Sequence, residues 1–327
     1  MENKNEKLLQ IEDLHIHYMS EGRKVQAVNG VSFEINAGET IGLVGETGAG
    51  KTTMALAIMK LIQKPAGRYA GGKIVFNGED LITASENRMH GIRGNQISMI
   101  FQDPMTSLNP VYTVGDQIAE VVALHQKVTA KQAMDRAGEV LELVGIPKER
   151  ADEYPHQFSG GMKQRVCIAM ALAANPQLLI ADEPTTALDV TIQAQVLDLM
   201  GKLKRELNTA MILITHDLGI VSEVCDKVAI MYAGRIIEFG TLEDIYRNPT
   251  HPYTLGLFNS IPKLTEKIHR LTPIKGLMPD PTNLPEGCAF APRCDHACKD
   301  CMHKRPDTEM INDTHAVACL RWRELTK

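Results

Sequence analysis

The sequence lacks both a long apolar segment and an excess of basic residues. Nowhere do about 18 apolar residues follow one another, so no membrane-spanning helix is predicted. The amino terminus, MENKNEKLLQ, is polar and charged and has no apolar core of the kind found in secretory signals. A net charge of -5 and a pI near 6.1 argue against the strong positive field of a general nucleic-acid binder. We therefore expect a cytoplasmic protein.

The bulk composition is that of an ordinary globular protein. With 327 residues, of which 44% are hydrophobic, the chain can bury a large core in one large domain or in two smaller ones. Evidence for a specific function must therefore come from local motifs.

A glycine-rich segment at residues 41–53, IGLVGETGAGKTT, predicts a buried strand, a tight loop and the start of a helix. Glycine lets the backbone approach an anion closely, so that consecutive amides can face phosphate oxygens. The positive end of the helix dipole adds to this attraction, while Lys51 can reach the β- and γ-phosphates and Thr52 can hold Mg²⁺. The residues expected to bind nucleotide here are Gly45, Glu46, Thr47, Gly48, Ala49, Gly50, Lys51, Thr52 and Thr53.

Alternating apolar and polar residues between positions 8 and 44 predict three strands that lead into this loop. Tyr18 lies at the end of the first of these strands. It is either a half-buried strand aromatic or the flat partner on which a purine ring stacks.

Gln102 follows an apolar strand predicted at residues 97–101. Pro104 and Pro110 come soon afterwards, and we expect them to keep this loop out of a helix. In most proteins such a glutamine would be a surface residue. At the carboxyl end of a strand beside a phosphate loop, Gln102 is placed to sense Mg²⁺ and the attacking water.

Helical periodicity at residues 114–145 predicts two amphipathic helices, which we expect to form a small helical subdomain inserted into the nucleotide core. They could equally be plain core helices, and none of their residues is chemically distinctive. A second glycine turn follows at Ser159, Gly160 and Gly161 and opens a long helix. A hydroxyl and exposed amides at a helix amino terminus make this turn a second candidate anion site, although such a turn is also a common helix start.

Two further predicted strands end in polar residues. An apolar run at residues 178–181 precedes Asp182, which can hold Mg²⁺ through water, and Glu183, a candidate general base for the water that attacks the γ-phosphorus. Another strand ends at His216, which could donate a hydrogen bond to the γ-phosphate, although a lone histidine is usually structural.

These motifs, in this order, resemble the nucleotide-binding subunit of an ATP-binding-cassette transporter. The resemblance rests on the phosphate loop, the glutamine loop at Gln102, the signature SGGMKQ, the segment LLIADEP, the ALD loop at Asp189 and the switch histidine His216. Phe158 and Met162 depart from the usual signature LSGGQ. The serine and both glycines remain, so we expect activity to survive.

The resemblance implies that two such domains pair head to tail, so that ATP on one phosphate loop is covered by the SGG turn of the other domain. Residues implied to act on the chain's own nucleotide are Lys51, Thr52, Gln102, Asp182, Glu183 and His216, with Thr52, Gln102 and Asp182 as the Mg²⁺ site. Tyr18 would stack on adenine. Residues implied to act on the partner's nucleotide are Ser159, Gly161 and Asp189.

The tail narrows the resemblance further. The segment from His251, HPYTLGLFNSIPKL, and the cysteine-rich end are similar to the D-type ATPase subunit of bacterial dipeptide and oligopeptide importers. This implies a cytoplasmic-face protein with a second ATPase, two membrane permeases and an external peptide-binding protein as partners. Nickel importers and some sugar importers use related subunits, so those substrates remain alternatives.

The implied fold is α/β, with a P-loop NTPase core of the RecA-like type, an antiparallel β subdomain, an inserted helical subdomain and a C-terminal cysteine-rich extension. We expect the nucleotide-binding domain at residues 1–248, with the helical subdomain at about 103–158, and the extension at 249–327. The helical subdomain should contact the membrane subunits.

Five of the seven cysteines lie in the last forty residues, which in a reducing compartment favours metal over disulfides. Cys288, Cys294, Cys301 and Cys319 match the cysteines of the importer tail, and Cys298 is extra. Four thiolates can hold zinc or a 4Fe-4S cluster. The resemblance favours the cluster, and a set of buried free thiols is the third alternative.

Two other functional classes fit the sequence less well. A non-transport cassette ATPase for DNA repair or translation would carry a long coiled-coil insertion or two cassettes, and the sequence has neither. A nucleic-acid-binding zinc module in the tail would need a basic surface, whereas basic residues there are interspersed with acidic ones.

Overall fold

The computed structural model describes residues 7–185, 189–260 and 273–325, which form two compact units. The first unit comprises the described parts of Met1–Leu8, Ile35–Thr40 and Asn77–Thr215. The second comprises those of Leu9–Glu34, Ile41–Phe76 and His216–Lys327. The phosphate loop and the C-terminal residues therefore belong to the same unit.

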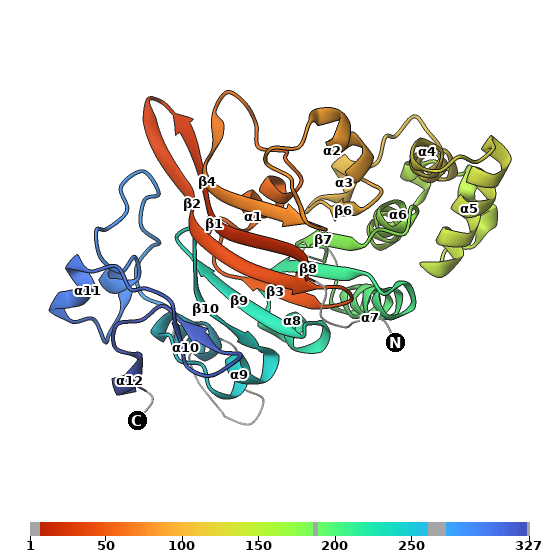
Figure 1. The fold of residues 1–327 in the computed structure, drawn as a ribbon. Coiled ribbons are helices and arrows are strands. Elements are labelled where there is room, and N and C mark those ends of the chain that lie inside the picture. The colour runs from red at the N-terminus through yellow and green to blue at the C-terminus, as the bar shows by residue number, and fades with distance from the viewer. Residues whose placement is uncertain (1–6, 186–188, 261–272, 326–327) are drawn as a thin grey trace. The chain divides into compact units, whose positions relative to one another are not determined.

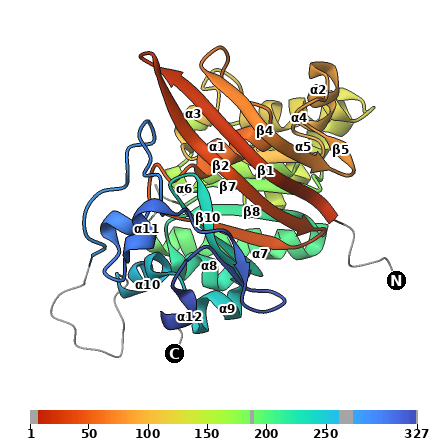
Figure 2. The same ribbon diagram turned by 60° about the vertical axis from the view of Figure 1, so that its left-hand side comes forward.

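Most of an antiparallel sheet lies in the second unit. Three of its four strands are β1 (Lys7–Ser20), β2 (Arg23–Asn36) and β4 (Gly67–Phe76) (Figure 2). Along β1 the buried positions change phase, because Leu9 and Ile11 are followed by Leu14 and Ile16. An irregularity in the register against β4 begins after Glu12, and Asp13 there has a φ of 44°. This bulge returns both apolar pairs to the same core.

The strand before the phosphate loop belongs to a mixed sheet. β3 (Thr40–Val44) is buried along its whole length and pairs in parallel with β9 (Lys227–Tyr232). β9 forms an antiparallel hairpin with β10 (Arg235–Thr241), and β12 (Ala316–Val317) and β11 (Glu309–Met310) extend it. The end of the chain therefore joins the sheet that carries the phosphate loop.

The helices of the second unit are α1 (Lys51–Ile58), α8 (Leu218–Val224), α9 (Leu242–Arg247), α10 (Pro252–Asn259), the 3-10 turn η3 (Ala291–Arg293), α11 (Lys299–His303) and α12 (Trp322–Leu325). A buried carboxylate fixes the start of the extension. Glu238 of β10 accepts hydrogen bonds from the amides of Thr250 (2.6 Å) and His251 (2.9 Å), and lies 2.9 Å from His315 Nε2. One side chain thus joins β10, the segment before α10 and the segment before β12.

The first unit is built on three parallel strands, β6 (Ile97–Ile100), β7 (Leu178–Asp182) and β8 (Ala210–Thr215). Every residue of β7 and β8 is buried, as is typical of parallel strands covered on both faces. Helices α4 (Val114–His125) and α5 (Ala130–Leu143) pack on each other and on α6 (Gly160–Leu172) (Figure 1). The remaining elements are β5 (Glu79–Asp80), α2 (Glu86–Ile92), α3 (Pro104–Ser107), η1 (Lys148–Asp152), η2 (Pro155–Gln157) and α7 (Val190–Leu207).

The strands and helices predicted from periodicity are present, but one local expectation is wrong. Residues 104–107 form the short helix α3, which begins at Pro104. Proline is well tolerated at the first position of a helix, because its missing N–H has no intrahelical partner there in any case. Within the described ranges, no helix is long and apolar enough to cross a membrane.

Candidate nucleotide site

The phosphate loop has a backbone that only glycine can form at two positions. A Cβ on Gly45 would lie 2.2 Å from the carbonyl oxygen of Met231, and one on Gly50 would lie 2.3 Å from that of Ala27. Gly50 also has a φ of 101° and is the residue before the first turn of α1. The loop is therefore held tightly between β9 and β2, and its shape depends on these glycines.

Lys51 lies along the loop with its side chain folded back. It is 5% exposed, and its Nζ donates hydrogen bonds to the carbonyl oxygens of Gly45 (2.7 Å) and Glu46 (3.1 Å). The next residue, Thr52, is exposed at the amino terminus of α1. The ammonium and the hydroxyl predicted to meet phosphate and Mg²⁺ thus both lie at the positive end of this helix.

Residues far along the chain hold the loop from one side, a feature that the sequence reasoning missed. Arg293 makes a two-pronged ion pair with Glu46, with Nη1 2.7 Å from Oε2 and Nη2 3.0 Å from Oε1. The backbone N–H of Glu46 donates to the hydroxyl of Tyr253 (3.0 Å), and Arg293 Nη1 also donates to the hydroxyl of Tyr232 (3.3 Å). We call Tyr232, Tyr253 and Arg293 the loop brace.

The brace is itself rigidly packed. Tyr232, Tyr253 and Phe290 form a set of mutually contacting rings, with centroids 4.7 to 5.4 Å apart. The Glu46 carboxylate is the main cause of the raised pKa of the Arg293 guanidinium, so this side chain is fully charged. A local reading of the sequence gives no signal for a contact between residues 247 positions apart.

Tyr18 lies near the start of α1. Its side chain is half-buried, and burial raises the pKa of its hydroxyl, an effect opposed by a hydrogen bond with the Thr53 side chain. The ring is therefore beside the helix that follows the phosphate loop. Stacking of adenine on Tyr18 stays a prediction.

In the first unit, the structure brings Gln102 and Glu183 together. Gln102 Nε2 donates a hydrogen bond to Glu183 Oε2 (3.0 Å), across 81 positions of sequence. Glu183 has a left-handed φ of 47°, and its amide donates to the carbonyl of Ile214 in β8 (2.9 Å). Strained backbone of this kind is common at functional sites. Asp182, immediately before it, is 2% exposed at the carboxyl end of β7.

The SGG turn is open, in contrast to the phosphate loop. Ser159 precedes α6, and its hydroxyl accepts a hydrogen bond from the amide of Met162 (3.4 Å). Ser159 and Gly160 are exposed, and a Cβ on Gly160 would meet nothing within 4 Å. Gly161 differs, because a Cβ there would lie 2.5 Å from Ile192 Cγ2.

The two departures from the usual signature share one neighbour. The ring of Phe158 lies 4.4 Å beneath the guanidinium carbon of Arg150, and Met162 Sδ accepts a hydrogen bond from Arg150 Nη1 (3.4 Å). Arg150 is held in place by Glu153, whose Oε2 is 2.6 Å from Nη2. The substitutions therefore form a local packing unit and leave the serine and the glycines of the turn unchanged.

The last two predicted residues lie at element ends. Asp189 precedes α7, and its carboxylate accepts a hydrogen bond from the amide of Ile192 (3.0 Å). Ala187 and Leu188 of the ALD loop lie outside the described residues. His216 is exposed directly after β8 and begins the last segment of the second unit. The roles assigned to these residues stay predictions.

Four of the five tail cysteines line one pocket: Cys288, Cys294, Cys301 and Cys319. Burial raises the pKa of each of these thiols, and that of Cys319 to about 11. The Cys298 sulfur lies 3.4 Å from that of Cys301. Nevertheless, no three His, Cys, Asp or Glu side chains within the described ranges are placed to hold a metal ion. The side-chain arrangement does not support the predicted zinc or 4Fe-4S site.

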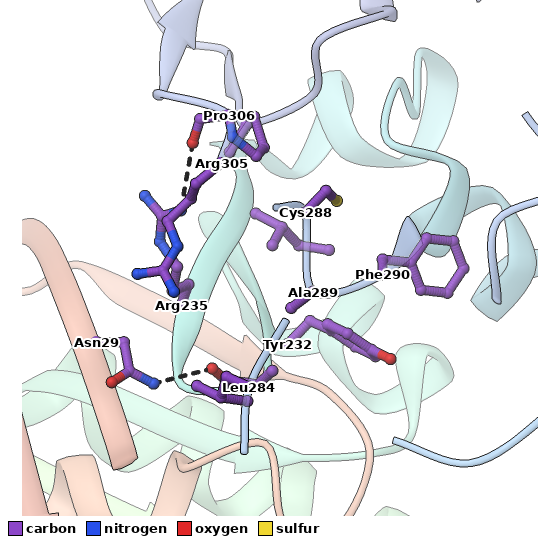
Figure 3. Close-up of a pocket in the computed structure, with 12 residues that line it drawn as sticks. Asn29, Tyr232, Arg235, Leu284, Cys288, Ala289, Phe290, Arg305 and Pro306 are labelled. Carbon is purple, nitrogen blue, oxygen red and sulfur yellow. Dashed lines mark hydrogen bonds between the residues drawn. The ribbon is translucent and has the colours of Figure 1, made fainter. Parts of the chain in front are cut away.

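A neighbouring pocket shares Cys288 and Phe290 with the cysteine pocket (Figure 3). Arg235 and Arg305 line it, and Arg235 donates a hydrogen bond to the carbonyl of Pro306 (3.2 Å). Burial, followed by the like charge of Arg305, lowers the pKa of Arg235. Positive charge thus lies close to the Cys288 thiol.

Comparison with known proteins agrees with this geometry. Residues 28–186 match the ABC transporter family, and residues 237–301 match the family described as oligopeptide/dipeptide transporter, C-terminal region. The chain is 53% identical to the oligopeptide transport ATP-binding protein OppD of Bacillus subtilis (strain 168), over 95% of this chain and 88% of that protein. The chain belongs to the ABC transporter ATPases. The family predicted from the sequence motifs is confirmed.

Other relatives of this ABC ATPase support the same family and fold. It is 50% identical to the dipeptide transport ATP-binding protein DppD of Bacillus subtilis (strain 168), over 96% of this chain and 94% of that protein. It is also similar to a dimeric post-hydrolysis structure of the ATP-binding cassette MJ0796 bound to ADP and Pi, at 25% identity and a TM-score of 0.65, covering 72% of this chain and 98% of that one. The predicted P-loop fold and ATPase activity are confirmed, whereas the cysteine-rich part of the fold prediction is not.

Proposed function

We propose that this ABC ATPase powers the import of dipeptides or oligopeptides into a bacterial cell. The observation that carries the proposal is the 53% identity to an oligopeptide transport ATP-binding protein along nearly the whole chain. The match of residues 237–301 to the oligopeptide/dipeptide transporter C-terminal region supports the same substrate class. In this assignment the chain is a peripheral subunit on the cytoplasmic face of the membrane.

ATP binds with its phosphates on the loop that ends at Lys51. The amides of the loop and the ammonium of Lys51 stabilise the negative charge of the β- and γ-phosphates. Glu183 orients the attacking water and accepts its proton, and the hydrogen bond from Gln102 holds the Glu183 carboxylate in position. His216 donates a hydrogen bond to the γ-phosphate.

The oxygen donors Thr52, Gln102 and Asp182 are of the type that Mg²⁺ prefers, and these residues would hold it. The exposed hydroxyl of Thr52 and the position of Asp182 at the end of β7 fit this assignment. When bound, Mg²⁺ neutralises phosphate charge.

A second ATPase completes the enzyme. Ser159, Gly160, Gly161 and Asp189 cover the nucleotide of the partner ATPase, and the exposure of Ser159 and Gly160 supports this role. The remaining partners are two membrane permeases, which contact the helical subdomain at about 103–158, and an external peptide-binding protein. The boundary between the nucleotide-binding domain and the extension, at residue 248, belongs to the same proposal.

We also propose that the cysteine pocket takes a 4Fe-4S cluster, with Cys288, Cys294, Cys301 and Cys319 as ligands. The support for this proposal is that the four cysteines line one pocket. As they are placed, no three His, Cys, Asp or Glu side chains of the described residues could hold a metal ion. Anaerobic purification tests it. About four irons per chain with a broad visible absorbance band would support the cluster, while zinc alone or no metal would contradict it.

The transport function can be tested in proteoliposomes that contain this chain, its partner ATPase and both permeases, with the peptide-binding protein on the outside. We expect a labelled oligopeptide to accumulate only when ATP is present on the side of the ATPases. A Lys51→Ala variant should abolish accumulation, and Lys275→Gln, which removes an exposed charge of the extension, should not. Uptake of nickel or a sugar, but not of peptide, would contradict the proposal.

A further inference from the structure

Every polar group of Glu46 is engaged. Its N–H binds Tyr253, its carbonyl accepts from Lys51, and its two carboxylate oxygens pair with the two terminal nitrogens of Arg293. The Arg293 side chain is 5% exposed and that of Glu46 is 31% exposed. Such bidentate pairs fix both distance and orientation, and a mostly desolvated pair interacts more strongly than a surface pair.

The charge of Glu46 is unfavourable for the task of the loop. A loop that binds a triphosphate gains from backbone N–H groups and cations, whereas a carboxylate in the same loop repels the ligand. Arg293 compensates this charge, and its Nε donates a further hydrogen bond to the carbonyl of Lys275 (2.8 Å). The C-terminal extension thus supplies a fixed positive charge directly to the phosphate loop.

We propose that Arg293 is a positioning residue for ATP binding, which acts through Glu46 by neutralising its carboxylate and fixing the loop. The ABC ATPase then depends on its C-terminal extension for nucleotide affinity. This rests on the assignment of the loop as the ATP site. It makes no use of a metal in the cysteine pocket.

A purely structural ion pair makes a different prediction from a charge-compensating one. If the pair only holds the fold together, then its variants should lose thermal stability but, while folded, bind ATP with the affinity of the wild type. If Arg293 acts by neutralising Glu46, then removing both charges should restore most of the affinity that the loss of Arg293 costs. A double-mutant cycle therefore separates the two.

The experiment measures ATP affinity of the full-length chain for the wild type, Arg293→Gln, Glu46→Gln, the double variant Arg293→Gln/Glu46→Gln and Arg293→Lys. We expect Arg293→Gln to weaken ATP binding about tenfold, because an uncompensated carboxylate remains beside the phosphates. The ATP affinity of the double variant should return to within about threefold of that of the wild type. The affinity of Arg293→Lys should lie between, since lysine restores the charge but cannot pair with both carboxylate oxygens at once. In the assembled transporter, KM for ATP should rise while kcat at saturating ATP stays within about threefold.

The matched control is Lys275→Gln, which removes an exposed cation of the same extension that pairs with Asp295, and it should bind ATP as the wild type does. Wild-type affinity in Arg293→Gln would overturn the inference, as would a double variant that binds no better than Arg293→Gln. Should Arg293→Gln fail to fold, the double variant and Arg293→Lys still decide, because weak binding by both in folded protein would overturn it. A wild-type chain that binds no ATP would instead contradict the proposed function.

Discussion

The two glycine turns of this ABC ATPase resemble each other in sequence but differ in their surroundings. The phosphate loop is closely packed, since a methyl group on Gly45 or Gly50 would run into backbone oxygens. The SGG turn is open, because Gly160 has no neighbour within 4 Å of an added Cβ. Both lie at the start of a helix, and so both offer backbone amides to an anion.

The difference indicates which turn is complete within one chain. The loop brace holds the phosphate loop through Glu46, and such pre-organisation lowers the cost of ordering the loop when ATP binds. The SGG turn presents Ser159 and Gly160 on an open surface. This exposure is consistent with the proposed role of the turn in covering the nucleotide of a partner ATPase.

Gly45→Ala is the substitution with the largest expected effect on the difference between the closely packed phosphate loop and the open SGG turn. The added methyl would lie 2.2 Å from the Met231 carbonyl oxygen, so the loop must move and its amides no longer point toward the phosphates. We expect no measurable ATP binding, with a lower melting temperature. Gly160→Ala is the matched control, and calorimetric titration should give it wild-type affinity. Equal ATP affinity in the two variants would remove the distinction between the turns.

Glu183→Gln separates ATP binding at the phosphate loop from the hydrolysis step. The amide is isosteric but cannot accept a proton, so turnover should fall by roughly a factor of 10² to 10⁴. ATP affinity should stay near that of the wild type, because Glu183 and the phosphate loop have separate tasks. Steady-state hydrolysis by the assembled transporter and ATP titration of the isolated chain check the two expectations. Near-normal hydrolysis would rule out Glu183 as the base.

Acid should weaken the brace of the phosphate loop. His251 is 1% exposed, and its Nδ1 accepts a hydrogen bond from the amide of Tyr253 (3.0 Å). Burial lowers its pKa to about 4, although Glu238 opposes this shift. Between pH 6.5 and about 4 the unfolded chain binds a proton that the folded chain does not, so stability present above pH 6.5 is lost as the pH falls.

From this shift we expect a loss of roughly 3 kcal/mol across that window. Urea unfolding at a series of pH values measures it. His251→Asn keeps a capping oxygen but cannot titrate, and should flatten the slope, whereas His90→Asn, at an exposed position of α2, should not. Identical slopes in wild type and His251→Asn would show that His251 does not carry the effect.

The smallest expected effect concerns the open turn. Gly160→Ala should leave folding and ATP binding of the isolated chain unchanged, but a methyl group on this surface should hinder close approach of the partner's nucleotide. We expect hydrolysis by the assembled pair to fall about tenfold, since misplacing a catalytic contact by a small distance is costly. Unchanged turnover would show that Gly160 does not face the nucleotide of the partner.

Sequence reasoning located the elements well, because strands, helices and glycine turns are local. The strand before Asp182, the glycine turn before Lys51 and the helices at 114–145 follow from periodicity and turn chemistry. The sequence did not predict the ion pair of Arg293 with Glu46, the ring contacts of Tyr253 or the left-handed backbone of Glu183. Those depend on which distant segments the fold brings together.

The tail cysteines also show what local sequence patterns cannot predict. Their number and their crowding in the tail suggested a metal site, and the fold does bring four of them to one pocket. The spacing of residues along a chain cannot fix how closely their side chains approach one another, and among the described residues no three His, Cys, Asp or Glu side chains are placed to hold a metal ion.

The most direct test of the account is photolabelling with an ATP analogue that carries a reactive group on its γ-phosphate. At concentrations where the chain is monomeric, the label should appear on the chain's own proposed ATP site, which comprises residues 45–53, Gln102, Asp182, Glu183 and His216, and not on residues 159–161. In the assembled transporter with wild-type partner ATPase, it should also appear on residues 159–161. Labelling of 159–161 in the monomer, or its absence in the assembled transporter, would contradict the claim that one turn holds this chain's ATP and the other covers the partner's.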